Sequence, residues 1–134
     1  AGLCFSARRG VDVNLIIPRK SDVFFMPWVG STYYYALLKA GVKIHEYLPR
    51  VYHAKTYIID EWVLLGSSNL NYRSLFHDLE VDLLVTHLAN KKLIRDEMKK
   101  DLSKSALVTK EYFKNVSWLR KVFTQFALLF KSWL

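Results

Sequence analysis

His53 and Lys55 stand two residues apart in a stretch rich in apolar and β-branched residues. If residues 55–59 form a strand, alternate side chains share one face, so the imidazole and the ammonium lie side by side. Such a pair suits an anionic phosphodiester. The ammonium holds a nonbridging oxygen as a point charge, and the imidazole attacks phosphorus or passes a proton to the leaving oxygen. The spacing therefore predicts phosphodiester chemistry at this pair.

Ser67, Asn69 and Glu80 add polar groups further along the chain. The hydroxyl and the amide follow a second short strand expected at 62–65, where they can donate hydrogen bonds to the same phosphate oxygens. Glu80, which opens the next expected strand, can accept a hydrogen bond from the far ring nitrogen of His53 and fix its tautomer. Ordinary roles stay open, because Ser and Asn are common in loops and Glu80 can face solvent.

Together with Asp60, these residues resemble the signature of the phospholipase D superfamily, which reads His-x-Lys-x4-Asp, then Gly-Ser/Gly-x-Asn, then an acidic residue. The matching positions are His53, Lys55, Asp60, Gly66, Ser67, Asn69 and Glu80. The resemblance spans residues 11–86, and residues 66–85 are most similar to the second half of bacterial cardiolipin synthases. One spacing departs from the pattern. The family commonly has six residues between its Asp and its Gly, whereas this chain has five, at 61–65, which we interpret as a tighter turn.

The resemblance implies a two-step reaction that uses neither a metal nor a cofactor. One histidine forms a covalent phosphohistidine and a second histidine protonates the leaving alcohol, so the family combines two such motifs, in one chain or in two identical subunits. This sequence carries one motif. We therefore expect one half of a two-half enzyme, inactive as an isolated monomer, that needs a missing N-terminal half or a second subunit. His53 is then the nucleophile or the general acid, Asp60 supports the turn, and phosphate binding falls to Lys55, Ser67 and Asn69.

The resemblance favours phosphatidyl transfer between phospholipids, of the cardiolipin synthase type. A homodimeric nuclease of the same superfamily is an alternative, because the formal net charge is +8 and basic proteins attract nucleic acid as well as anionic lipid. A non-catalytic fragment, or a half-domain that only binds membrane, is the third possibility.

Composition also bears on location. The single cysteine excludes an internal disulfide and fits a reducing compartment. No apolar run reaches the roughly 18–20 residues that a membrane-spanning helix needs. We therefore expect a peripheral protein at the cytoplasmic face of the cell membrane, in contact with a phospholipid substrate and the membrane surface.

The elements that must position the site alternate between strand and helix patterns. Helices are expected at residues 31–40, which precede Gly41, and at 89–105. Apolar and β-branched runs predict strands at residues 11–18, 42–47, 55–59, 62–65 and 80–86. Such alternation indicates an α/β fold with a mixed sheet flanked by helices, of the phospholipase D-like type. This half-domain would cover residues 1–109.

Residues 110–134 differ in character. Apolar residues recur there at three- or four-residue steps, which predicts a basic, aromatic amphipathic helix. Its stripe either docks on the core or a missing half, or lies in the membrane interface. The remaining histidines, His45, His77 and His87, are expected in structural or surface roles. Arg73 either reaches a phosphate or pairs with a nearby carboxylate.

Overall fold

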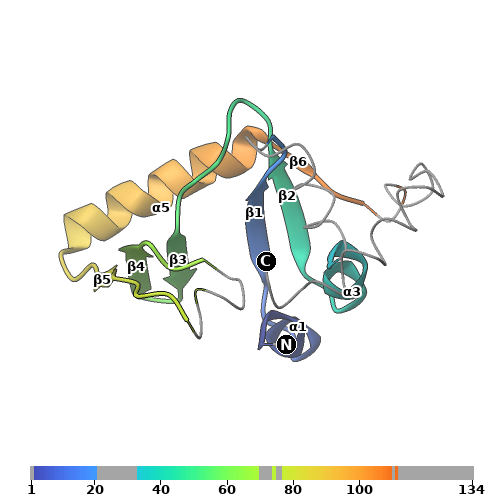
Figure 1. Ribbon diagram of the computed structural model, residues 1–134, viewed down its shortest axis with the longest axis horizontal. Helices are drawn as coiled ribbons and strands as arrows, with labels where there is room; N and C mark the ends of the chain where they lie inside the picture. Colours follow the sequence, from blue (N-terminus) through green and yellow to red (C-terminus); the bar gives the residue numbers. More distant parts are fainter. Residues whose placement is uncertain (1, 21–32, 70–73, 75–76, 110, 112–134) are drawn as a thin grey trace. The chain divides into compact units, whose positions relative to one another are not determined.

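The computed structural model (Figure 1) describes residues 2–20, 33–69, 74, 77–109 and 111. These residues form two compact units. Of the described residues, the first holds those up to Tyr52 and those from Leu102 to Glu111, and the second runs from His53 to Asp101. Every residue of the predicted site falls in the second unit.

A three-stranded sheet lies at the centre of the first unit. Its strands are β1 (Asn14–Pro18), β2 (Lys43–Tyr47) and β6 (Ser105–Leu107), in the order β1-β2-β6. β1 and β2 run parallel, and β2 and β6 run antiparallel, so the sheet is mixed. Parallel neighbours need a crossover connection, and α3 (Tyr34–Lys39) lies between β1 and β2 in the chain. α1 (Gly2–Arg8) precedes β1.

The helices α1 and α3 end in the same way. A glycine with positive φ follows each of them, Gly10 at +91° and Gly41 at +95°. After α3, the Gly41 amide donates to the Leu38 carbonyl at 3.1 Å and the Val42 amide to the Leu37 carbonyl at 3.0 Å. This is a Schellman motif, which needs a left-handed residue that glycine adopts without steric cost. Gly41 therefore fixes where the helix ends and where the chain turns into β2.

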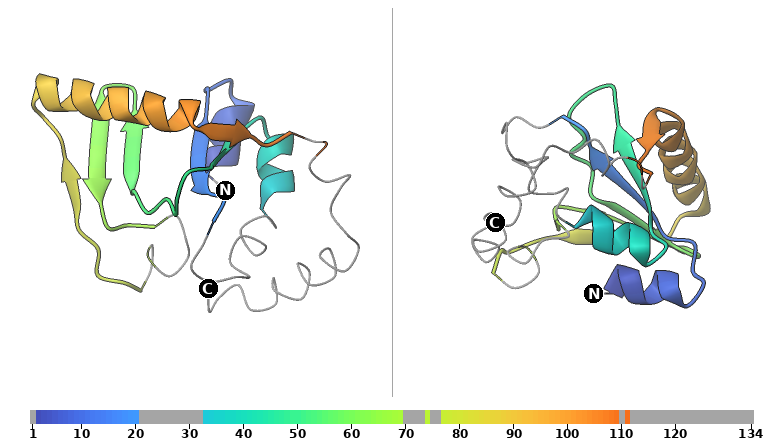
Figure 2. Two further views of the ribbon diagram at one scale, coloured as in Figure 1. Left: turned by 90° about the horizontal axis from the view of Figure 1, so that it is seen from above. Right: turned by 90° about the vertical axis from the view of Figure 1, so that its right-hand side faces the viewer.

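The core of the first unit lies between this sheet and its two helices. Val42 and Ile44 are buried there together with Tyr34 of α3 and Val108, which follows β6. Apolar residues of β1, α1 and α3 pack around them, and the two helices lie side by side (Figure 2). The hydroxyl of Tyr34 donates to a carboxylate oxygen of Glu46 at 3.2 Å, which provides the partner that a buried tyrosine requires.

An antiparallel sheet forms the centre of the second unit. Its strands are β3 (Thr56–Ile59), β4 (Trp62–Gly66) and β5 (Asp82–Leu84), in the order β3-β4-β5. A two-residue turn joins β3 to β4, with Ile59 paired to Trp62. This is the tight hairpin that the short spacing of 61–65 predicted.

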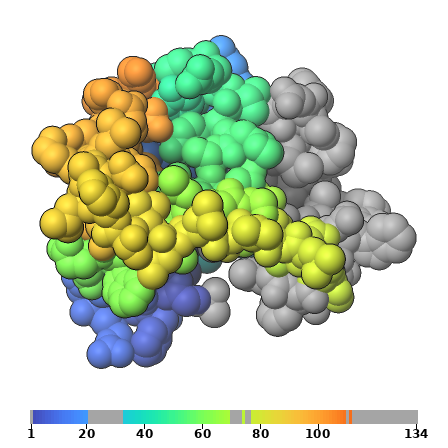
Figure 3. Space-filling model, turned by 90° about the vertical axis from the view of Figure 1, so that its left-hand side faces the viewer, coloured from blue at the N-terminus to red at the C-terminus, as the bar shows by residue number. Residues whose placement is uncertain are grey.

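Burial is uneven across this second sheet. Val63 of the central strand is fully buried, whereas Leu83 and Leu84 of β5 keep 66% and 45% of their surface exposed. Figure 3 shows the yellow segment that contains β5 at the surface of the molecule. Edge strand β5 thus presents apolar side chains to the outside.

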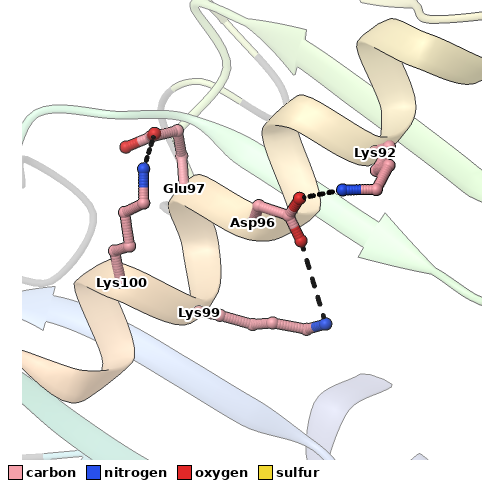
Figure 4. A network of polar contacts seen from close by, with 5 residues as sticks. All are labelled: Lys92, Asp96, Glu97, Lys99 and Lys100. Carbon is pink, nitrogen blue, oxygen red and sulfur yellow. Dashed lines mark hydrogen bonds and ion pairs between the residues drawn. The ribbon is translucent and has the colours of Figure 1, made fainter.

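Helix α5 (Leu88–Ser103) has residues up to Asp101 in the second unit and carries many charges. Its exposed side chains form ion pairs three or four residues apart (Figure 4), namely Lys92–Asp96 at 2.7 Å, Lys99–Asp96 at 3.9 Å and Lys100–Glu97 at 2.6 Å. Such pairs support a helix only weakly at an exposed surface, because solvent screens the charges. They support the helix itself, since all of their partners lie within it.

The predicted α/β class is confirmed, but three details differ. The strands divide into two sheets. The helix expected at 89–105 ends at Ser103, because residues 105–107 pair with β2 across a long sequence separation as β6. The strand expected at 80–86 is reduced to Asp82–Leu84. Its ladder stops because the Val81 amide donates to the Ser67 hydroxyl and not to a backbone carbonyl.

Other predictions fall outside the described residues. These are Arg73 and, apart from Glu111, the whole of residues 110–134, so the amphipathic helix and the boundary at 109 stay predictions. Within the described ranges, no helix is long and apolar enough to cross a membrane.

Candidate active site

His53 and Lys55 are in contact just before β3 begins. The Lys55 Nζ lies 3.0 Å from each ring nitrogen of His53 and donates to the His53 carbonyl oxygen at 3.1 Å. A neutral imidazole has one nitrogen with a lone pair, so the ammonium donates to whichever nitrogen is unprotonated. His53 is exposed and Lys55 is half-buried. The pair therefore presents a positive charge and a potential nucleophile at one accessible place.

The GSSN segment, residues 66–69, is anchored to the strands on both sides of β4. The Gly66 amide donates to the Lys55 carbonyl at 3.1 Å, and the Ser67 amide donates to the Val81 carbonyl at 3.0 Å. In return, the Val81 amide donates to Ser67 Oγ at 3.0 Å. That bond uses the hydroxyl oxygen of Ser67 as an acceptor and leaves its proton for another acceptor. Ser67 is exposed.

Ser68, between the two predicted phosphate ligands, makes three hydrogen bonds. Its hydroxyl donates to Asp82 Oδ2 at 2.5 Å and its amide donates to Asp82 Oδ1 at 3.4 Å. Its carbonyl accepts a hydrogen bond from the Tyr57 hydroxyl at 2.7 Å. Sequence reasoning missed both partners. The sequence did contain a pattern that points to them. Tyr57 lies two residues after Lys55, and Asp82 lies two residues after Glu80, so each shares a strand face with a predicted site residue.

Asn69 completes the segment. Its Nδ2 donates to the hydroxyl of Ser74 at 3.4 Å, and Ser74 is buried. Asn69 itself is exposed. The contact ties the amide side chain to a buried group without removing it from solvent.

Glu80 is half-buried in the extended stretch before β5, and no hydrogen bond or ion pair joins it to His53 in the described part of the chain. Its charge acts instead on Tyr57. Burial raises the pKa of the Tyr57 hydroxyl, and the carboxylates of Asp82 and Glu80 raise it further. The structure thus groups Glu80 with Tyr57, and the predicted orientation of His53 by Glu80 stays a prediction.

Asp60 lies in the turn between β3 and β4 and has a positive φ of 48°. Two basic side chains of α5 donate hydrogen bonds to the backbone carbonyls of this turn. Arg95 donates from its guanidinium to the Asp60 carbonyl, and the Lys91 ammonium donates to the Glu61 carbonyl at 2.8 Å. The structure therefore gives Asp60 a role in the hairpin that carries Lys55 and Gly66 at its open end.

No group of three or more His, Cys, Asp or Glu side chains gathers closely enough to hold a metal ion within the described ranges. The GSSN segment, whose Gly66 amide bonds the Lys55 carbonyl, carries exposed hydroxyl and amide groups that can donate hydrogen bonds to an anionic ligand.

Comparison with known proteins gives a consistent result. Residues 2–102 match the family described as "Cardiolipin synthase, PLD-like domain". The chain is similar to the proteins named cardiolipin synthase A from Klebsiella pneumoniae, Cronobacter sakazakii and Citrobacter koseri, with 39% identity over 84 residues in each. The matched region covers 62% of this chain and 17% of each relative. No solved structure matches the chain significantly.

Proposed function

We propose a function from one premise, that the chain belongs to the cardiolipin synthase, PLD-like domain family. In the full-length protein it contributes one half of a phosphodiester-transfer site, with His53 as a reacting group and Lys55 as the cation that holds the phosphate. The contact between the Lys55 ammonium and both ring nitrogens of His53, at 3.0 Å, carries this proposal. A phosphate oxygen that replaces His53 as the partner of this ammonium brings phosphorus within reach of the imidazole.

The reaction has two steps that balance without a cofactor. In the first, a histidine nitrogen bonds to phosphorus while the bond from phosphorus to the leaving alcohol oxygen breaks, and the second histidine gives that oxygen its proton. In the second, an acceptor alcohol loses its proton to the second histidine and bonds to phosphorus as the bond to the first histidine breaks. His53 takes one of these two parts. The other part belongs to a histidine outside this motif.

Charge on the phosphate oxygens needs donors that are already in place. The hydroxyl proton of Ser67 and the amide of Asn69 provide them, since both side chains are exposed and both are tied to neighbours that fix their position. Fixed donors stabilise charge in the transition state without reorganising during the reaction. Glu80 is proposed to reach His53 once a second half completes the site.

Three features support a second half: the short coverage of the relatives, the single motif and the exposed edge strand β5. The chain spans 17% of the length of the cardiolipin synthase A relatives, and this sequence holds one His-x-Lys motif. Edge strand β5 keeps Leu83 and Leu84 exposed, and exposed apolar edges of this kind are surfaces that proteins cover by pairing. We therefore propose that the missing half, on the same chain or on a second subunit, completes the site.

The proposed substrate is a phospholipid, and the reaction is phosphatidyl transfer at the cytoplasmic face of the membrane. The relatives named cardiolipin synthase A support the lipid class, and the net charge of +8 supports attraction to anionic lipid. The charge also favours the second candidate, a nuclease, since DNA attracts the same cations.

The test uses the full-length protein with vesicles of phosphatidylglycerol. His53→Ala is expected to lower the rate of phosphatidyl transfer by about 10²–10⁴-fold, the usual contribution of a group that transfers protons, or more if it is the nucleophile. His87→Ala is the matched control, because His87 is an exposed histidine in the connection between β5 and α5. This variant should leave the rate unchanged.

Three outcomes separate the alternatives. Undiminished transfer by the His53→Ala variant would contradict the proposal. Cleavage of DNA that depends on His53, with no turnover of lipid, would favour the nuclease. Acid-labile ³²P on the protein after mixing with labelled phosphatidylglycerol would support the phosphohistidine, and a label mapped to the peptide that contains His53 would identify His53 as the nucleophile.

A further inference from the structure

Ser68 lies between two exposed side chains that are proposed to bind phosphate, yet it is itself half-buried. Its amide, hydroxyl and carbonyl are all engaged, the first two by Asp82 and the third by Tyr57. Bonds to an ionised carboxylate are about twice as strong as those between neutral groups. Ser68 is therefore fixed at three points, its amide, its hydroxyl and its carbonyl.

The place of Asp82 is set by the sheet. Gly66 of β4 pairs with Asp82 of β5, and the Gly66 amide bonds the backbone of Lys55 on the other side. Directly paired residues of an antiparallel sheet project to the same face, so these three positions form one row across the sheet. Because Gly66 has no side chain, the Asp82 carboxylate occupies the space above it, where a Cβ would lie 1.8 Å from Oδ1. Asp82 therefore reaches Ser68 across a gap that only glycine provides.

Tyr57 approaches Ser68 from the other edge strand. It stands two residues after Lys55 on β3, so the two side chains share a face. Tyr57 is half-buried, and its backbone pairs with Leu64 of β4. A tyrosine hydroxyl is protonated at neutral pH, and the raised pKa of Tyr57 extends the pH range over which it stays protonated. It therefore remains a donor to the Ser68 carbonyl at neutral and mildly alkaline pH.

We propose that Tyr57 and Asp82 are positioning residues that act through Ser68 to fix the Ser67 hydroxyl and the Asn69 amide relative to Lys55. The inference deepens the proposed function and rests on it. Neither residue touches substrate. Each holds one side of Ser68, Asp82 from β5 and Tyr57 from β3, and so sets the spacing of donors on which stabilisation of the phosphate depends. Misplacing such a group by about 1 Å costs on the order of 10²-fold in rate.

The experiment measures kcat and KM for phosphatidyl transfer in the full-length protein, with each rate divided by the folded fraction. Tyr57→Phe removes one oxygen and keeps the ring, and Asp82→Asn keeps the shape and removes the charge. Each is expected to lower kcat about tenfold, equivalent to about 1.4 kcal/mol of barrier, with KM within about twofold because remote parts of the lipid still bind.

The chain offers matched controls for both changes. Tyr34→Phe removes a hydroxyl that also donates a hydrogen bond, to Glu46 at 3.2 Å, but in the first unit. Asp12→Asn removes a carboxylate that bonds Lys43 at 2.8 Å, also in the first unit. Both should leave kcat unchanged. A common loss of kcat in Tyr34→Phe and Tyr57→Phe would show that the effect is not specific to the bond from Tyr57 to Ser68 and would overturn the inference.

A double variant tests the route through Ser68. If Asp82 acts through the Ser68 hydroxyl, Ser68→Ala with Asp82→Asn lowers kcat no further than the larger single loss. Fully multiplied losses would overturn that route. Folded Tyr57→Phe and Asp82→Asn proteins with kcat within twofold of the parent would refute the positioning role, provided that His53→Ala has lowered transfer as expected. Undiminished transfer by the His53→Ala variant would instead refute the proposed function.

Discussion

The carboxylate of Asp82 stands over Gly66, with its Oδ1 only 1.8 Å from the place where a Cβ would be. The backbone is also too close for a side chain, since that Cβ would lie 2.4 Å from the Val81 carbonyl oxygen and 2.7 Å from the Asp82 Cα. The space between β4 and β5 is therefore closed to any side chain at position 66. A glycine that resembles part of a phosphate-binding motif is required here for the packing of two strands.

Gly66→Ala is expected to force β5 away from β4. Overpacking of this kind costs about 1–3 kcal/mol in the free energy of unfolding, and moving β5 should also lower transfer activity because Asp82 loses its place beside Ser68. Urea unfolding measures the first effect. Gly2→Ala is the matched control, since nothing lies within 4 Å of the added Cβ there. An unchanged unfolding midpoint in Gly66→Ala would contradict the close approach.

Substitutions of Asp60 can distinguish a role in the turn from a role in the chemistry. Its φ of 48° is costly for β-branched residues and free for glycine. Asp60→Gly should therefore keep both stability and kcat close to the parent, whereas Asp60→Val should lose about 1–2 kcal/mol of unfolding free energy. Thermal melting and transfer assays measure the two. Glu61→Val controls for the branched side chain at the neighbouring turn position. A folded Asp60→Gly protein with a tenfold lower kcat would assign Asp60 to the chemistry.

The contact of His53 with Lys55 could be predicted because it depends on alternation within one short stretch. The hairpin followed from the same local pattern, and so did the end of α3 at Gly41. Strand β6 could not be predicted, since three residues form a strand only by pairing with β2, about sixty positions earlier. The link from Ser68 to Asp82 spans fourteen residues and depends on the register of β4 against β5. Local sequence does not determine that register.

Acid should destabilise the first unit through His45. Its Nε2 lies 3.0 Å from Asn14 Oδ1. Burial lowers the pKa of His45 from its usual 6.5, the charge of Lys43 lowers it further, and Asp12 opposes them. The unfolded chain therefore takes up a proton first as pH falls, so the stability contribution is complete above pH 6.5 and is lost below it. Urea midpoints measured from about pH 8 down to about pH 5 should decline through this window.

His45→Gln provides the control for that decline. Glutamine keeps a donor for Asn14 and does not titrate, so the variant should show a smaller fall in the urea midpoint between about pH 7 and about pH 5. Asp12 does not account for the same window. Its pKa is lowered by the hydrogen bond from Lys43, so its contribution is lost only below its usual value of 3.8. Equal declines in the parent and the variant would assign the acid sensitivity to other groups.

Arg95 should stabilise the hairpin from outside, because its guanidinium donates to the Asp60 carbonyl beside the bond from Lys91 to Glu61. Arg95→Met keeps the aliphatic stem and removes the donors, so we expect a loss of about 0.5–1.5 kcal/mol in unfolding free energy. The amide of Trp62 should also exchange faster with solvent, because the turn opens more often. Lys92→Met is the control, since Lys92 bonds Asp96 on its own helix at 2.7 Å and not the hairpin turn. If both variants changed Trp62 exchange equally, the effect would belong to α5 as a whole and not to the Arg95 contact.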